Sequence, residues 1–349
     1  MIRIGVLGAS GVGAAHIEAL RTVEGVEVVA VGGSSKESAA ATAARLRVPA
    51  SFVGSADMIQ SGSMDALHVC TPNDLHVDAV RAAFEAGLHV VCEKPLTTNT
   101  TEAAELASLA AASSSASTVC YHYRYSTLIP DLVGLIEGGG LGRIHSVRAN
   151  YLQNWQINSD PSWRNDPARS GASRVLADIG THLIDLVEFT SDQRITSIDA
   201  DFLALRGDVQ PGNDDVAIAL ARTSSGALVS LSVSQVSPGH MNSISIELDG
   251  EHGTARWSLT DRETLEFTSV EDTAALELDG HANPKTMRRV WHSRLDPEAR
   301  LQALFGAFYG PLLGTPTLSS ISLPSFDDAA RHVALVGQAA LGITLTPAN

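Results

Sequence analysis

Cysteine is scarce in this sequence, and its cysteines lack the spacing of a metal site. Cys70, Cys92 and Cys120 are the three cysteines in 349 residues, and each lies in or beside an apolar run without a C-x-x-C pair. Such cysteines are typical of reduced, buried thiols in a cytoplasmic protein. We therefore expect a cytoplasmic protein without a bound metal.

Basic residues are few compared with acidic ones. The 24 lysines and arginines are outnumbered by 39 aspartates and glutamates, which gives a net charge of −15. Nucleic acids and anionic membranes bind basic surfaces, so we expect neither as a partner. No apolar run is long enough to cross a bilayer, and the chain opens on an apolar strand without a secretory signal. An anionic cofactor is still compatible with this charge, because backbone amides can bind phosphate.

The length and the pattern of elements predict two domains. Residues 1–122 alternate apolar strands with helices, which predicts an α/β fold with a doubly wound parallel sheet. Residues 123–349 are richer in strands joined by short polar turns, which predicts an α+β domain with a large, mainly antiparallel, open-faced sheet. The clearest strands of this second domain lie at 144–153, 216–222, 227–235, 243–248 and 254–259.

A glycine-rich turn follows the first strand. The segment 8–13, GlyAlaSerGlyValGly, keeps the spacing of the dinucleotide fingerprint G-x-G-x-x-G, except that Ser10 replaces its middle glycine. That glycine normally lets the backbone approach a pyrophosphate, but serine is small and Gly11 adds slack. A turn of this kind can also serve only tight packing. Its place between a strand and a helix favours a nucleotide cofactor bound by Gly8, Ser10, Gly11 and Val12.

The end of the second strand bears on the choice of cofactor. An NAD-specific site usually carries an acid here, which accepts a hydrogen bond from the ribose 2′-hydroxyl. This chain has Gly33, Ser34, Ser35 and Lys36 instead, and two hydroxyls with an ammonium group suit a 2′-phosphate. The same residues could simply cap the next helix. We expect NADP(H) to be favoured, with NAD(H) as the alternative.

Two further motifs follow strands of the predicted parallel sheet. ThrProAsnAspLeuHis at 71–76 follows the strand 66–70, and GluLysProLeu at 93–96 follows the strand 88–92. Ligands of open α/β sheets bind at such carboxyl edges. Lys94 could hydrogen-bond a reacting hydroxyl there, or it could be a solvated charge after a strand. The combination of these two strand-end motifs with the glycine-rich turn at the N-terminus favours the hydroxyl ligand.

A third motif combines an acid and a histidine. Asp178 and His182 are four residues apart, so on a helix they share one face. Histidine has an ordinary pKa of about 6.5, which suits a general base near neutral pH. Asp178 could orient that imidazole or contact substrate hydroxyls. A surface Asp/His pair is the plainer alternative.

These motifs together resemble one enzyme family. Asn73 and His76, the GluLysProLeu segment, and Asp178 with His182 occur in the order and at the spacing of the glucose-fructose oxidoreductase and inositol dehydrogenase family, Gfo/Idh/MocA. The resemblance implies a Rossmann domain, an open-faced sheet domain, and NAD(P)-dependent oxidation or reduction of a sugar or cyclitol carbon. It also implies catalytic roles for Lys94, Asp178 and His182, with His182 as proton acceptor and Lys94 as hydroxyl ligand.

The resemblance completes the set of expected site residues. Further cofactor contacts are expected from Thr71, Pro72, Asn73, His76, Glu93, Lys94, His122 and Arg164. Substrate contacts are expected from Lys94, Arg124, Gln153, Trp155, Trp163, Asp178 and His182, which suit a neutral polyol. We expect His16 to be structural or to lie near the cofactor phosphates, without a catalytic role, and His332 to lie on the surface. A homodimer or homotetramer through the second sheet is also implied.

The sequence departs from the family pattern at two places, and other functions stay open. The segment 170–173, SerGlyAlaSer, stands where a glycine run often precedes the catalytic aspartate, and His122 stands where asparagine is frequent. Both departures could reshape the pocket, so no particular sugar is predicted. The alternative enzyme is an NAD-dependent glycosidase or lyase that works through a transient keto-sugar. A catalytically silent nucleotide sensor or structural partner is a further alternative, against which the intact Lys94, Asp178 and His182 argue.

Overall fold

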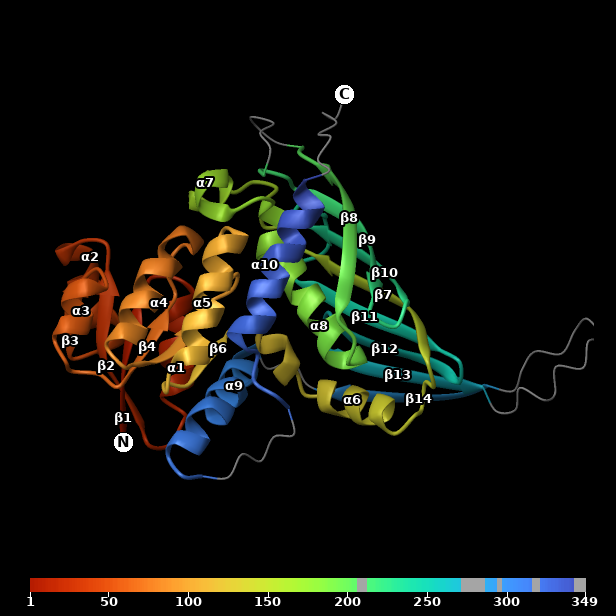
Figure 1. Ribbon diagram of the computed structural model, residues 1–349, viewed down its shortest axis with the longest axis horizontal. Helices are drawn as coiled ribbons and strands as arrows, with labels where there is room; N and C mark the ends of the chain where they lie inside the picture. The colour runs from red at the N-terminus through yellow and green to blue at the C-terminus, as the bar shows by residue number, and fades with distance from the viewer. Residues whose placement is uncertain (206–211, 271–285, 294–296, 316–320, 342–349) are drawn as a thin grey trace, which may run out of the picture.

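The first domain is a six-stranded parallel sheet between helices (Figure 1). The computed structural model describes residues 1–205, 212–270, 286–293, 297–315 and 321–341. The elements of this domain are β1 (Ile2–Leu7), α1 (Val12–Leu20), β2 (Val26–Gly33), α2 (Lys36–Leu46), β3 (Ala50–Val53), α3 (Ala56–Gln60), β4 (Ala66–Val69), η1 (Asn73–Leu75), α4 (His76–Glu85), β5 (His89–Cys92), α5 (Thr100–Ala112) and β6 (Ser117–Val119). The order β3-β2-β1-β4-β5-β6 confirms the predicted doubly wound Rossmann fold.

Backbone pairing brings the predicted cofactor motifs to one edge of this sheet. Leu7 pairs with Gly32 on one side and with Val69 on the other, and Val69 pairs with Cys92. The residues that follow β1, β2, β4 and β5 therefore lie along a single carboxyl edge. The strand order reverses between β1 and β4, which is the point where open α/β sheets bind ligands.

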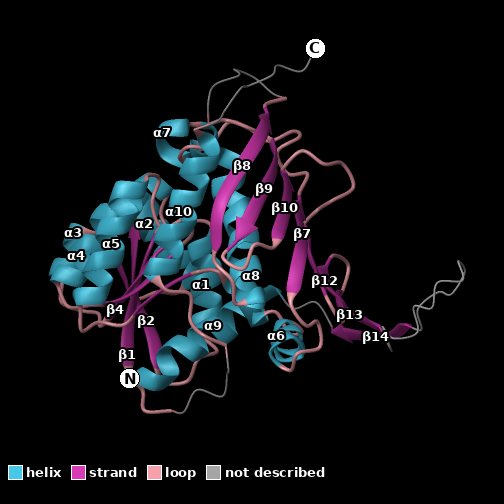
Figure 2. Cartoon of the chain, turned by 45° about the vertical axis from the view of Figure 1, so that its right-hand side comes forward, coloured by secondary structure: helices cyan, strands magenta, loops and turns pink. Residues whose placement is uncertain are grey.

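The second domain contains an eight-stranded sheet (Figure 2). Its elements are η2 (His122–Tyr125), α6 (Ile129–Glu137), β7 (Ile144–Leu152), η3 (Trp163–Asn165), α7 (Pro167–Ser170), the π-helical turn η4 (Leu176–Gly180), α8 (Thr181–Ser191), β8 (Ile195–Leu203), β9 (Val216–Thr223), β10 (Leu228–Ser234), β11 (Ser243–Gly250), β12 (Gly253–Leu259), β13 (Glu263–Val270) and β14 (Thr286–Ser293). The order is β14-β13-β12-β11-β7-β10-β9-β8, and among these described strands only β10 and β7 pair in parallel.

One face of this sheet is covered and the other is open. Along β9, Ala217 and Ala219 are buried, whereas Ile218 and Leu220 are 50% and 66% exposed. The covered face packs on α6 and α8 in one hydrophobic core, which includes the fully buried Trp257. This alternation with a period of two confirms the predicted mainly antiparallel, open-faced sheet.

The last two helices, α9 (Pro297–Leu312) and α10 (Phe326–Ala340), return to the first domain. Leu304 and Phe305 of α9 share a buried cluster with Ile4 of β1. Helix α10 contacts both α5 and α8, and it lies between them in Figure 1. The C-terminal helices therefore pack on the first domain, although they follow the second sheet in the sequence.

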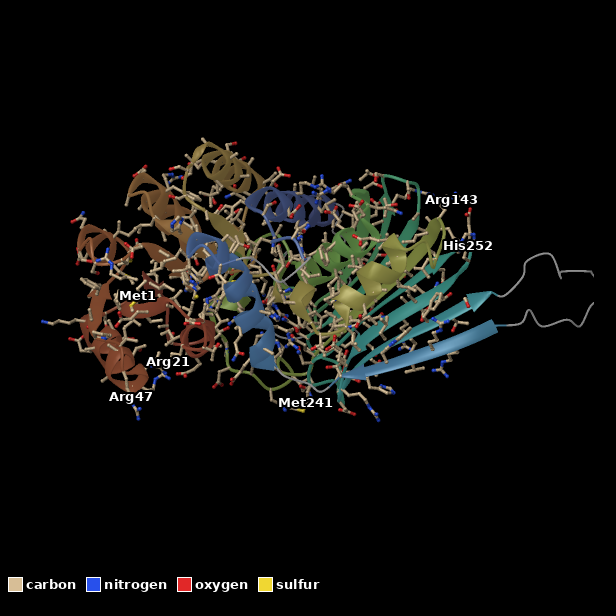
Figure 3. All side chains as sticks on the ribbon, turned by 90° about the horizontal axis from the view of Figure 1, so that it is seen from below. Met1, Arg21, Arg47, Arg143, Met241 and His252 are labelled. Atoms are coloured by element: carbon tan, nitrogen blue, oxygen red, sulfur yellow. The ribbon has the colours of Figure 1, made fainter. Side chains whose placement is uncertain are left out.

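Charged side chains lie at both ends of the molecule. Figure 3 places Arg21 and Arg47 on the first domain and Arg143 at the far end of the second. Arg143 forms an exposed ion pair with Glu251, whose oxygen lies 2.9 Å from its Nε. No helix in the described part of the chain combines the length and the apolar character needed to cross a membrane.

Candidate active site

The turn after β1 has the backbone shape of an anion site. Gly8 adopts a φ of 86°, and a Cβ here would meet the carbonyl oxygen of Cys70 at 2.6 Å, so only glycine fits. A Cβ at Gly11 would meet nothing within 4 Å, and α1 begins beside it with no side-chain cap and no acid in its first turn. Because the N–H groups of such a helix start are open to anions, the turn fits a dinucleotide phosphate, with Ser10 and Val12 exposed beside it.

Of the residues that follow β2, one caps the next helix and two are exposed to solvent. Ser35 accepts a hydrogen bond at Oγ from the backbone N–H of Ser38 at 3.2 Å, so it caps α2. Its hydroxyl hydrogen can still be donated to a phosphate, because a hydroxyl both accepts and donates. Ser34 and Lys36 are exposed next to it, after the half-buried Gly33.

In the motif after β4, the Thr71 hydroxyl is free to bind a ligand, whereas His76 has a structural role. Thr71 and Pro72 follow β4 at the edge, and the buried Thr71 hydroxyl has no hydrogen-bond partner in the described structure. Asn73 is buried, and its side-chain amide donates to the backbone carbonyl of Ser170, which ends α7. His76 is fully buried, with Nε2 2.9 Å from the Thr71 carbonyl and Nδ1 3.0 Å from that of Pro95. The prediction that His76 binds cofactor is wrong, because both ring nitrogens face backbone carbonyls of the two loops.

A buried histidine holds Glu93. The Nε2 of His16 lies 3.0 Å from Oε1 of Glu93, and the backbone N–H of Lys94 donates to Oε2 at 3.1 Å. Burial opposes ionisation of Glu93, but His16 and then Lys94 lower its pKa to about 2. The ionised carboxylate therefore fixes the start of the Lys94 loop. Glu93, His16 and Cys120 also have ligand atoms within 4.8 Å of one another, so this group could hold a metal ion.

An ion pair between the two domains forms the centre of the site. Lys94 donates from Nζ to Oδ1 of Asp178 at 2.8 Å and to the backbone carbonyl of Asp178 at 2.7 Å. The two side chains are 15% and 21% exposed, so the pair is open to solvent on one side. Burial opposes ionisation of Asp178, but the charges of Lys94 and then Arg164 lower its pKa to about 2. Asp178 is therefore ionised at neutral pH.

Asp178 lies in a π-helical turn that leads directly into the helix of His182. Leu176–Gly180 forms this wider turn, and α8 follows it. The Asp178 carboxylate points to Lys94 and to Gln235, whose Nε2 donates to Oδ2 at 2.6 Å. In place of the single regular helix that was expected, the structure has a π turn at Asp178 and an α-helix at His182. Such turns are frequent at functional sites.

The imidazole of His182 lies among aromatic rings. Its centroid is 4.9 Å from the ring of Tyr123 and 5.3 Å from that of His122. His182 is 4% exposed, and its Nδ1 has no hydrogen-bond partner in the described structure. Burial, and then the charge of Lys94, hold its pKa well below the ordinary value. The ring is therefore neutral at neutral pH and able to accept a proton.

Aromatic and amide side chains of the second domain lie beside the ion pair. The guanidinium of Arg164 is 4.5 Å from the ring of Trp163 and 5.8 Å from that of Trp155, and its Nε is 3.9 Å from Oδ2 of Asp178. The Trp155 indole donates to Oε1 of Gln153 at 2.9 Å. Cation–π contacts stabilise this arrangement. Arg164 thus links Asp178 to the predicted residues Trp155 and Trp163, and Trp155 in turn contacts Gln153.

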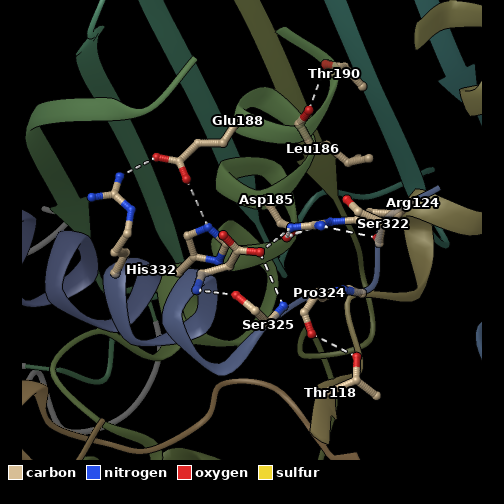
Figure 4. A network of polar contacts seen from close by, with 12 residues as sticks. Thr118, Arg124, Asp185, Leu186, Glu188, Thr190, Ser322, Pro324, Ser325 and His332 are labelled. Atoms are coloured by element: carbon tan, nitrogen blue, oxygen red, sulfur yellow. Dashed lines mark hydrogen bonds and ion pairs between the residues drawn. The ribbon is translucent and has the colours of Figure 1, made fainter. Parts of the chain in front are cut away.

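Two predictions about the domain junction are wrong (Figure 4). Arg124 is 4% exposed and donates to Asp185 from Nε at 2.9 Å and from Nη2 at 2.6 Å, while Nη2 also contacts Asp328. It is not a substrate ligand, because its donors are used in a buried ion pair. His332 is not a surface residue, since it is fully buried with Nε2 3.4 Å from Oε2 of Glu188.

Two residues near the site were missed in the sequence. Arg300 of α9 lies with Nε 3.4 Å from Nδ1 of His122, and its guanidinium is 5.0 Å from the ring of Tyr123. Gln235 follows β10. Neither has a local sequence signal, because the return of α9 and the parallel pairing of β10 with β7 bring them here. The one available hint was that the strands 144–153 and 227–235 both end on glutamine.

We expect His182 to stay neutral throughout the neutral pH range. Its pKa in the folded protein is depressed, so protonation begins only well below the ordinary value of about 6.5. An NMR titration of the ring resonances, assigned by their loss in His182→Gln, measures the midpoint. A midpoint at or above that ordinary value would contradict the expected electrostatics of the site.

Comparisons with known proteins agree with this geometry. Residues 2–121 match the model of an oxidoreductase family with an NAD-binding Rossmann fold, and residues 131–256 match the GFO/IDH/MocA C-terminal domain. Levoglucosan dehydrogenase of Pseudarthrobacter phenanthrenivorans is 29% identical over 266 residues, which cover 70% of this chain and 68% of that protein. Inositol 2-dehydrogenase of Rhodococcus erythropolis is 29% identical over 258 residues, which cover 73% of this chain and 71% of that protein.

Solved structures share the whole architecture. An oxidoreductase domain protein from Kribbella flavida superposes with a TM-score of 0.84 at 26% identity, covering 98% of this chain and 97% of that one. Levoglucosan dehydrogenase in complex with NADH has the same fold, with a TM-score of 0.84 at 23% identity over 97% of each chain. Since the family models cover most of both domains, this chain belongs to the GFO/IDH/MocA family of NAD-binding oxidoreductases.

Proposed function

We propose that this protein transfers a hydride between a nicotinamide dinucleotide and a hydroxyl-bearing carbon of a sugar, sugar derivative or cyclitol. The observation that carries the proposal is the meeting of Lys94 with Asp178 at 2.8 Å, within electrostatic reach of a neutral His182. These groups lie where the strand ends of the NAD-binding domain meet the second domain. Relatives named levoglucosan dehydrogenase and inositol 2-dehydrogenase support the class of substrate.

The three residues divide the chemistry between them. A bound nicotinamide dinucleotide supplies the acceptor or the donor of the hydride. Loss of a hydride from a carbinol carbon requires removal of the hydroxyl proton in step, and neutral His182 takes this proton on its imidazole. Lys94 donates from Nζ to the same oxygen and stabilises the negative charge that builds on it in a partly dehydrated site. In the reverse direction His182 returns the proton.

The surroundings of the ion pair favour a neutral polyol as substrate. The aromatic faces of Trp155 and Trp163 suit the apolar C–H face of a sugar ring, and the Gln153 amide suits its hydroxyls. The nearest cations, Lys94 and Arg164, both face the Asp178 carboxylate. Both cations are thus engaged by a carboxylate, which competes with a phosphate group for them.

Sugars and cyclitols assayed with NAD⁺ and NADP⁺ test the proposed function through the absorbance of the reduced nicotinamide. We expect net reduction with at least one neutral polyol and little with its phosphorylated counterpart. Turnover of a sugar without net reduction, and with tightly retained cofactor, would identify the glycosidase or lyase instead. The glucose-6-phosphate 3-dehydrogenase of Bacillus subtilis, 30% identical over 54% of this chain, makes the phosphorylated sugars an informative contrast.

Replacing His182 by alanine removes the proposed base. We expect kcat to fall about 10²–10⁴-fold while the affinity for cofactor stays nearly unchanged, because the imidazole acts on the hydroxyl proton. His145→Ala removes an exposed histidine from β7 and should leave kcat unchanged. If His182→Ala keeps more than about a tenth of the parental kcat, histidine is not the base and Lys94 becomes the better candidate.

We propose that NADP(H) is favoured over NAD(H). The residues 33–36 at the end of β2 carry no acid, and Ser34 and Lys36 are exposed there. The ammonium group of Lys36 stands at the start of α2, where the helix dipole adds to its attraction for a 2′-phosphate. The solved levoglucosan dehydrogenase complexes contain NADH, so this preference is proposed for the present chain alone.

Lys36→Ala should narrow the gap between the affinities for NADP(H) and NAD(H). One charge-assisted contact to phosphate corresponds to about a ten- to a hundredfold difference in affinity. Calorimetry or fluorescence titration with both cofactors measures the ratio, and Arg143→Ala is the control because Arg143 lies at the far end of the second domain. Equal affinities in the parent protein would refute the preference.

We propose that the open face of the second sheet joins copies of this chain into a homodimer or homotetramer. Ile218, Leu220 and Leu228 are 50%, 66% and 54% exposed on the neighbouring strands β9 and β10. Exposed apolar residues gathered on one face are typical of an interface. Light scattering should give two or four times the mass of the chain, and a monomer at micromolar concentration would contradict this.

A further inference from the structure

We infer that Gln235 is a positioning residue that orients the Asp178 carboxylate, an inference that rests on the proposed function. Gln235 follows β10, is fully buried, and donates from Nε2 to Oδ2 of Asp178 at 2.6 Å. Lys94 donates to Oδ1 of the same carboxylate at 2.8 Å. Each oxygen is thus bound by a different domain. Together these two bonds fix the rotation of the carboxylate.

A buried arginine decides which way the Gln235 amide points. Arg174 donates from Nη1 to Oε1 of Gln235 at 2.8 Å and binds Asp215 through Nη2. A guanidinium can only donate hydrogen bonds, so the amide oxygen must face Arg174. The amide NH₂ is therefore left to face Asp178. The hydrogen bonds that link Asp215, Arg174, Gln235 and Asp178 therefore have fixed donors and acceptors: Arg174 donates to Asp215 and Gln235, and Gln235 donates to Asp178.

The surroundings hold Gln235 rigidly. Arg174 and Asp215 are each 1% exposed, and hydrogen bonds in such a dry interior are costly to break. The backbone N–H of Gln235 donates to the Asp215 carbonyl at 3.0 Å, and its carbonyl accepts from the N–H of Gln156 at 3.2 Å. Asp178, by contrast, lies in the π turn, which is wider than an α-helical turn. The side-chain bond from Gln235 therefore supplies a constraint that the helix does not.

Orientation of Asp178 in turn decides where the Lys94 ammonium stands. An ammonium group has three donors, and two of these go to Oδ1 and the backbone carbonyl of Asp178. The third is left for a substrate oxygen. If the carboxylate rotates, the Lys94 ammonium moves with it, and its third N–H no longer points at the substrate oxygen. Gln235 thus acts on the reaction through Asp178 and Lys94, without touching the substrate.

Gln235→Glu tests this role with almost no change of volume. The new carboxyl group still accepts from Arg174, but it presents an acceptor to Asp178. At low pH the two carboxyl groups can share a proton and keep the bond, whereas at high pH both ionise and repel each other. We expect the ratio of kcat, variant to parent, to lie within about threefold of unity near pH 5.5 and to fall about ten- to a hundredfold by pH 9.

Two further variants complete the experiment. Gln235→Leu removes the donor at every pH, so kcat should fall about tenfold or more without a pH trend, while KM for the cofactor changes less than about twofold. Gln193 lies beside β8, where its amide oxygen accepts from the Thr223 hydroxyl. Gln193→Glu adds the same charge there, away from Asp178, and should leave the ratio of kcat, variant to parent, independent of pH. A flat ratio for Gln235→Glu, or a Gln235→Leu variant that keeps more than half of kcat, overturns the inference.

Failure of the proposed function has a different signature. If the parent protein turns over no polyol, the function is refuted, but the polarity of the bond to Asp178 can still be measured. The difference in melting temperature between Gln235→Glu and the parent should then widen as pH rises, because repulsion between the two carboxylates grows. A difference independent of pH would overturn the inference by itself.

Discussion

The ion pair between Lys94 and Asp178 is the contact on which the site depends. It joins a loop of the Rossmann domain to a π turn of the sheet domain, and it is only partly exposed. A pair in such a place is favourable only when its remaining polar atoms are also satisfied. Gln235 binds the second carboxylate oxygen, and Glu93 binds the backbone N–H of Lys94. The surrounding hydrogen bonds therefore make the ion pair stable at the place where the two domains meet.

One cation also sets two protonation states. The ammonium group of Lys94 favours the ionised form of Asp178 and disfavours the protonated form of His182. Burial acts in opposite senses on the two, because it opposes the charge on each: it raises the pKa of the acid and lowers that of the histidine. As a result Asp178 is ionised and His182 is neutral at neutral pH. A dehydrogenase acting on a hydroxyl group needs this combination at neutral pH.

The sequence predicted the parts of the site that follow regular elements. Alternating strands and helices require a parallel sheet, so the sequence predicts Gly8 and Lys94 at one edge of that sheet, as the structure has them. The π turn has no comparable sequence signal, so a regular helix was expected at Asp178. Arg124 and His332 were misjudged because their buried partners come from distant segments of the chain. Gln235 was missed because nothing local specifies the parallel pairing of β10 with β7.

A double-mutant cycle on Lys94 and Asp178 tests the central claim most directly. The value of kcat/KM for the best polyol is measured for Lys94→Met, for Asp178→Asn and for the double variant, with cofactor affinity as a check on folding. Residues that act as a unit are strongly non-additive, so we expect the double variant to lose little more activity than the worse single variant. Losses that multiply would show that Lys94 and Asp178 act independently, and would contradict this account.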